Sequence, residues 1–124
     1  MNGRRGEQGS AVVEFALILP VVVLVLLAVV EVTVVARTQY ELVHAAREGA
    51  RTAATVADPS QAVRAVQAAL DPAVAGRVRV SVERPETVGS SAVVTVVLPH
   101  RLGAMILGGL RIDLRARSVM RVER

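Results

Sequence analysis

The chain has 124 residues, no cysteine and a formal net charge of +4. Without cysteine it has no disulfide framework, no thiol nucleophile and no thiolate metal site. The length leaves room for one membrane helix and one outer domain of about 85 residues, a size that is only marginally stable without an anchor or partners.

The chain begins with a short polar segment, residues 1–8, which carries Arg4 and Arg5. Basic residues beside a first membrane helix favour retention on the cytoplasmic side. We therefore expect the amino terminus inside the cell and the carboxyl-terminal domain outside the membrane.

An unbroken apolar run extends from Phe15 to Val30. These residues would make a helix of about 24 Å, slightly short of a ~30 Å hydrocarbon layer. Extending the run to residues 10–36 gives a sufficient length, with Glu14 and Glu31 near its two ends. Pro20 inside the run predicts a kink or a loosened turn. The pattern predicts a single transmembrane helix over residues 10–36.

A removable secretory signal is the alternative interpretation of this run, because Val34 and Ala36 fit a small-residue cleavage pattern. The following segment, residues 37–57, favours the membrane helix, since it continues the helical pattern without a turn residue. Small and apolar residues recur there at alternating steps of three and four, which places them on one helix face that allows close packing. This packing stripe comprises Val43, Ala46, Ala50, Ala53 and Ala57.

Asp58 and Pro59 end the long helix, which we expect to run for about 70 Å from Ser10 to Val56. Asp58 then caps a second helix, and residues 71–76 repeat the start signal on a smaller scale. After Gly76 the apolar period changes from 3.6 to 2, which predicts strands over 78–83, 90–98 and 110–122, the second stopping at Pro99. The expected fold is α+β, with residues 58–124 forming a small outer domain around a three-stranded antiparallel sheet.

The apolar segment 101–110 lies between the last two predicted strands. It either fills the core or lies on the membrane surface, and the pattern favours the core.

No set of residues suited to catalysis is present. His44 and His100 are the two histidines, and neither lies in a local acidic cluster that would make a metal site. No glycine-rich loop leads from a strand into a helix. We expect no enzyme activity, no cofactor, no metal and no small-molecule substrate.

Arginines alternate with apolar residues along two of the predicted strands. If those strands are near neighbours, the arginines form a basic face for anionic lipid, acidic glycan or nucleic acid. Nucleic acid is disfavoured because no aromatic residue lies between them for base stacking. An ordinary solvated face is the simpler interpretation, since Asp113, Glu83 and Glu123 partly balance the charge. The arginines concerned are Arg77, Arg79, Arg111, Arg115, Arg117 and Arg121.

Glu14 is the most informative residue of the chain. A carboxylate at the edge of the hydrocarbon layer is costly unless it is paired, so it indicates function unless it simply reaches headgroup water. It lies five residues after Gly9 and is followed directly by Phe15.

The run GSAVVEFALILP, the later Glu31 and the motif AAREGAR at residues 45–51 together resemble the TadE-like family. The GSAVVEF stretch is similar to the processing site of type IV prepilins. The family comprises minor pilins or pseudopilins of the tight-adherence (Flp) pilus system of bacteria. One departure is Val32, where the family often has an aromatic residue; this weakens any aromatic anchoring at the outer face of the membrane.

The resemblance implies a pilin-like protein of the bacterial inner membrane. Residues 1–9 would be a leader that a prepilin peptidase removes between Gly9 and Ser10, with Gly9, Glu14 and Phe15 as recognition or assembly positions. Other pilin subunits, the assembly platform and membrane lipid would be the partners. The alternative is a membrane-tethered binding module that uses the basic face and never enters a pilus.

Overall fold

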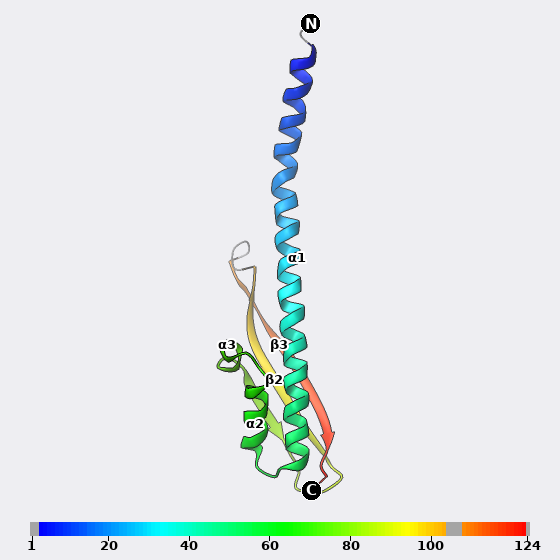
Figure 1. Ribbon diagram of the computed structural model, residues 1–124, viewed down its shortest axis with the longest axis vertical. Coiled ribbons are helices and arrows are strands. Elements are labelled where there is room, and N and C mark those ends of the chain that lie inside the picture. Colours follow the sequence, from blue (N-terminus) through cyan, green and yellow to red (C-terminus); the bar gives the residue numbers. More distant parts are fainter. Residues whose placement is uncertain (1–2, 104–107, 124) are drawn as a thin grey trace. The chain divides into compact units, whose positions relative to one another are not determined.

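The computed structural model describes residues 3–103 and 108–123. It contains three helices, α1 (Gly3–Thr55), α2 (Pro59–Ala68) and α3 (Pro72–Ala75), followed by three strands, β1 (Arg79–Glu83), β2 (Ser91–Leu102) and β3 (Leu110–Arg121) (Figure 1). The predicted α+β fold, with a long apolar amino-terminal helix and a three-stranded antiparallel sheet, is confirmed. The prediction for the apolar segment 101–110 concerns mainly residues 104–107, which lie outside the described residues.

The chain divides into two compact units, Met1–Val34 and Val35–Arg124. Unit 1 is built from helix α1 alone, and α1 is continuous through Pro20. Every residue from 9 to 30 is exposed, so unit 1 has no core of its own in this described range.

Unit 2 contains the carboxyl-terminal part of α1, both short helices and the sheet. Asp58 caps α2 because its carboxylate accepts hydrogen bonds from the backbone N–H (2.9 Å) and the hydroxyl (2.7 Å) of Ser60. Asp58 has an extended backbone conformation, and α1 ends three residues before it, at Thr55. The prediction that Ala57 shares the packing stripe is therefore corrected: Ala57 lies beyond α1 and is exposed.

The strand order is β1-β2-β3, with both pairs antiparallel. β2 continues through Pro99 to Leu102, which corrects the predicted stop at Pro99. The pairing with β1 ends at Val97, so from Leu98 onward β2 pairs with β3 alone. Proline is tolerated in such an edge segment because one side of the strand makes no ladder.

The core of unit 2 lies between one face of the sheet and the two helices α1 and α2. Leu42 and five alanines of α1 contribute to it, together with Val66 of α2 and Val94 of β2. Gly49 lies at the closest approach, since a Cβ atom added there would collide with the Val66 side chain and lie 3.2 Å from Val94 Cγ1. The small residues of α1 thus allow α2 and β2 to pack directly against its backbone.

Candidate functional site

The apolar span of unit 1 presents large hydrophobic side chains on all sides of the helix. Val, Leu, Ile and Phe side chains between Val12 and Val34 are between 39% and 70% exposed. Such a surface is unfavourable in water, at roughly 25 cal/mol for each Å². Within the described residues, α1 is the helix that is long and apolar enough to cross a membrane, from Gly9 onward. Its length and composition are those of a membrane anchor.

The residues of the predicted processing site lie at the start of this span. Ser10 Oγ donates a hydrogen bond to Glu14 Oε1 at 3.3 Å, one helical turn away. Gly9 has no neighbouring side chain or chain segment within 4 Å of the position a Cβ would occupy. Phe15 is 66% exposed. Gly9 is helical here, so a peptidase that needs an extended chain must unwind this turn, and glycine lowers the cost of doing so.

The packing stripe lies in the part of α1 that belongs to unit 2. Ala46, Ala50 and Ala53 are completely buried, and Val43 packs against the edge of the same core. These residues contact the protein's own sheet and second helix, so in this fold they stabilise unit 2.

The arginines of the basic face are all exposed, but they do not lie on adjacent strands. β2 lies between β1 and β3, and one row across the sheet reads Arg79, Val97, Arg115. The next row reads Ser81, Thr95, Arg117. The prediction of a single basic face is therefore corrected. The arginines form two borders, one along β1 and one along β3, because the half-buried residues of β2 between them are valine and threonine. Arg77 lies just before β1, and Arg111 and Arg121 lie near the two ends of β3.

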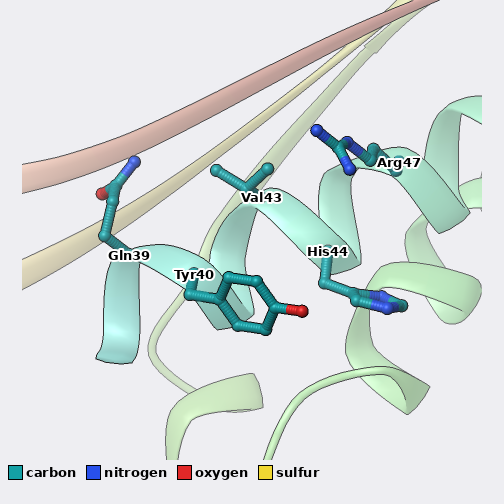
Figure 2. A pocket seen from close by; sticks show the side chains of 5 residues that line it. All are labelled: Gln39, Tyr40, Val43, His44 and Arg47. Atoms are coloured by element: carbon teal, nitrogen blue, oxygen red, sulfur yellow. The ribbon is translucent and has the colours of Figure 1, made fainter. Parts of the chain in front are cut away.

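A small hollow of about 180 Å³ lies on the outer side of α1 and is lined by Gln39, Tyr40, Val43, His44 and Arg47 (Figure 2). The rings of Tyr40 and His44 meet edge to face, with centroids 6.3 Å apart. Ligand pockets usually enclose about 300–1,000 Å³, so this hollow is a surface feature of the helix.

The second histidine, His100, lies in β2, far along the chain from His44. Within residues 3–103 and 108–123, the structure brings together no group of three side chains able to hold a metal ion.

The comparison with protein families decides what the first part of the chain is. Residues 9–51 match the model of the family described as TadE-like protein. This segment resembles the TadE-like family. The resemblance noted in the sequence is thereby confirmed over this segment. The curated proteins and the solved structures with which the chain was compared include no match to it.

The TadE-like match begins at Gly9 and ends at Arg51. It therefore covers both the membrane anchor and the buried turn that contains Gly49. The two parts of the match have different environments: the first is exposed, whereas the second includes Ala46 and Ala50, which lie in the core of unit 2.

Two residues with structural roles were not found from the sequence. Arg84 donates from Nε to the carbonyl oxygen of Ala53 at 2.7 Å, and the backbone N–H of Glu123 donates to that of Ala54 at 3.0 Å. Both bonds satisfy carbonyl groups at the end of α1, which have no partner within the helix. Arg84 lies outside the alternating arginine pattern, and no local signal marks it.

Proposed function

We propose that this protein is a minor pilin or pseudopilin that supports assembly of a tight-adherence (Flp) pilus. It would be inserted in the bacterial inner membrane with its amino terminus in the cytoplasm. The observation that carries the proposal is that the TadE-like match starts at Gly9, five residues before Glu14, and that the exposed apolar span follows Glu14.

The chemistry of this segment supports processing after Gly9. Cleavage of the Gly9–Ser10 bond by a prepilin peptidase would leave a positively charged amino group on Ser10. Glu14 lies one turn along the helix, with its carboxylate already 3.3 Å from Ser10 Oγ. In an assembly of parallel helices, an amino group of a neighbouring subunit would neutralise that carboxylate within the apolar layer, where an unpaired charge is costly.

The decisive experiment is to determine the amino terminus of the full chain after expression in a cell that has a prepilin peptidase. A mature chain that begins at Ser10 supports the proposal. A chain that begins at Met1 indicates simple anchoring, and one that begins at Arg37 indicates a secretory signal. Either of the last two results contradicts the proposal.

The Gly9→Val variant tests the processing site itself. A bulky side chain at the cleavage position is expected to block maturation and to reduce piliation. Gly6→Val in the proposed leader is the matched control and should be processed normally. Unchanged processing of Gly9→Val would contradict the proposal.

The Glu14→Gln variant separates assembly from processing. It keeps the size of the side chain and removes the charge that would pair with the Ser10 amino group. We expect normal membrane insertion but loss of pili. Normal piliation in this variant would show that the charge has no role in assembly.

A membrane-tethered module that binds an anionic partner is the second candidate function. The exposed arginine borders on either side of β2 favour it. It requires no cleavage, so the amino terminus of the mature chain distinguishes the two functions.

A further inference from the structure

The sheet of unit 2 narrows at one end. Pairing between β1 and β2 ends at Arg79 and Val97, while β2 and β3 continue as a two-stranded ribbon to Leu102 and Leu110. On this ribbon Arg101 lies directly opposite Arg111. Like charges directly opposite each other destabilise a strand pair. An anion between the two guanidinium groups would remove that repulsion.

The same end of the sheet is hollowed. Arg77, Pro99, His100, Arg101 and Arg111 line an open depression of about 580 Å³. Arg77 is oriented there by a hydrogen bond from its Nε to the carbonyl oxygen of Ala73 at 3.3 Å. Three guanidinium groups around one depression suit a phosphate group, because the planar fork of arginine binds phosphate oxygens in pairs.

Asp113 is the acidic residue next to this depression in β3, and its ion pair is with Arg79 and not with one of the three arginines that line the depression. Asp113 follows Arg111 by two residues, and its Oδ2 lies 3.9 Å from Nη2 of Arg79. The positive charges of Arg77, Arg101 and Arg111 are therefore available to an anion in the depression.

Two hydrogen bonds between α1 and β3 show at which end of unit 2 the depression lies. Gln39 Nε2 donates to the carbonyl oxygen of Arg115 at 2.8 Å, and Glu123 N–H donates to that of Ala54 at 3.0 Å. β3 and this part of α1 therefore run in the same direction. From Arg115 back to Arg111 is about 13 Å along a strand, whereas from Gln39 back to Val35 is about 6 Å along a helix.

The arginine pair therefore lies at the end of unit 2 where α1 enters it. The predicted membrane span ends at Ala36, and the next residues include Arg37 and the 71% exposed Tyr40. Tyrosine is enriched at the membrane–water interface, and arginine often extends its charge into the headgroup layer. Because the predicted membrane span joins unit 2 at this end, the phosphates of lipid headgroups are the anions that best suit the three guanidinium groups.

We propose that Arg77, Arg101 and Arg111 bind the phosphates of anionic phospholipids at the membrane surface. The inference rests on the membrane anchoring included in the proposed function, and it adds a second attachment of unit 2 to the membrane. The site would hold the ribbon end of the sheet against the headgroups.

The test uses the full chain, incorporated in nanodiscs of phosphatidylcholine and phosphatidylglycerol. The ratio of the two lipids retained on the protein after release into an uncharged detergent is measured by native mass spectrometry. We expect wild type to retain phosphatidylglycerol preferentially. In the double variant Arg101→Gln, Arg111→Gln, the ratio of retained phosphatidylglycerol to phosphatidylcholine should be about tenfold lower.

The matched control is Arg117→Gln, Arg121→Gln, which removes the same charge from the other end of the sheet. It should keep the wild-type preference. Hydrogen exchange of the β2 amides should be the same in all three proteins, which shows that each variant is folded.

Four results would overturn the inference. An equal loss in both double variants would show that net charge alone attracts the lipid, and no loss in either would show that these arginines do not bind it. If millimolar inorganic phosphate abolishes the preference, the site holds a free anion. A chain that fails to remain in the nanodisc would overturn the membrane anchor as well, so failure of the proposed anchoring is recognised separately.

Discussion

The two units of this protein use parts of one helix in opposite ways. In unit 1 the helix carries large apolar residues on all sides, and from residue 9 to 30 every one is exposed. In unit 2 the apolar residues of α1 are mostly alanine, and Ala45, Ala46, Ala50 and Ala53 are completely buried. Side-chain size therefore distinguishes the two environments better than hydropathy does: the large residues are exposed, and the small ones allow neighbouring backbone to approach.

Glycine shows the same contrast within the TadE-like segment. Gly9 has open space where a Cβ would be, whereas the same atom at Gly49 would collide with Val66 of α2. The first glycine suits access by another protein, and the second suits contact within this one. Paired substitutions in the two units test this contrast.

The largest expected effect comes from truncating leucine in each unit. Leu42 is completely buried in unit 2, so Leu42→Ala should lower its free energy of unfolding by about 3 kcal/mol. Leu24 is 48% exposed in unit 1, and Leu24→Ala should leave that free energy unchanged. Both free energies are measured by denaturing the full chain in uncharged detergent and monitoring unfolding through hydrogen exchange of the β2 amides. Equal losses would mean that the two units unfold together.

Adding a methyl group at the two glycines gives the next effect. Alanine normally stabilises a helix by about 1 kcal/mol relative to glycine. At Gly49 the collision with Val66 should reverse the sign, so that Gly49→Ala lowers the stability of unit 2 by about 2 kcal/mol. Gly9→Ala is the control and should not change it. A gain in stability for Gly49→Ala, measured by the same exchange experiment, would show that α2 can move away from α1.

Removing the guanidinium group of Arg84 should have a smaller effect. Arg84→Met keeps most of the side chain but leaves the carbonyl oxygen of Ala53 without this donor, at a cost of about 1.5 kcal/mol. Arg117→Met removes an exposed arginine of β3 and should have little effect. Faster exchange confined to the last turn of α1 in the Arg84 variant would localise the loss. Identical stability of the two variants would exclude a role for this hydrogen bond.

The smallest effect concerns pH. Hydrogen bonds from the side chain and the backbone of Ser60 hold the pKa of the Asp58 carboxyl below its ordinary value. A carboxyl group with a lowered folded-state pKa stabilises the fold above its unfolded-state pKa, and this contribution is lost as the pH falls through the folded-state value.

The Asp58→Asn variant keeps a capping residue but lacks this titration. The difference in unfolding free energy between wild type and variant should therefore be constant between pH 5 and pH 8. It should decrease once the pH is lower than about 4. The comparison is made by denaturant titration at each pH. A difference that stays constant down to pH 3 would show that the Ser60 hydrogen bonds do not favour the charged form.

Local patterns predicted most of the fold. The cap at Asp58 with Pro59, and the change of period after Gly76, depend on neighbouring residues alone, so they can be recognised in the sequence. The anchor and the Gly9–Phe15 stretch were likewise visible, because the order of residue types there is itself the signal.

Features that depend on residues distant in the chain were not predictable. The continuation of β2 past Pro99 depends on where β1 ends, and the separation of the arginines depends on β2 lying in the middle of the sheet. Arg84 reaches Ala53 across 31 positions of sequence. The opposition of Arg101 and Arg111 follows from the strand register, which alternating periodicity does not determine.

The hydrogen bonds that join α1 to β3 in unit 2 have a mechanical consequence. Because Gln39 and Ala54 of α1 bond to Arg115 and Glu123 respectively, the helix and the strand run side by side in the same direction. Within unit 2, a force along the axis of this part of α1 would therefore also be directed along β3, so it would shear the β2–β3 ladder lengthwise instead of opening it one bond at a time.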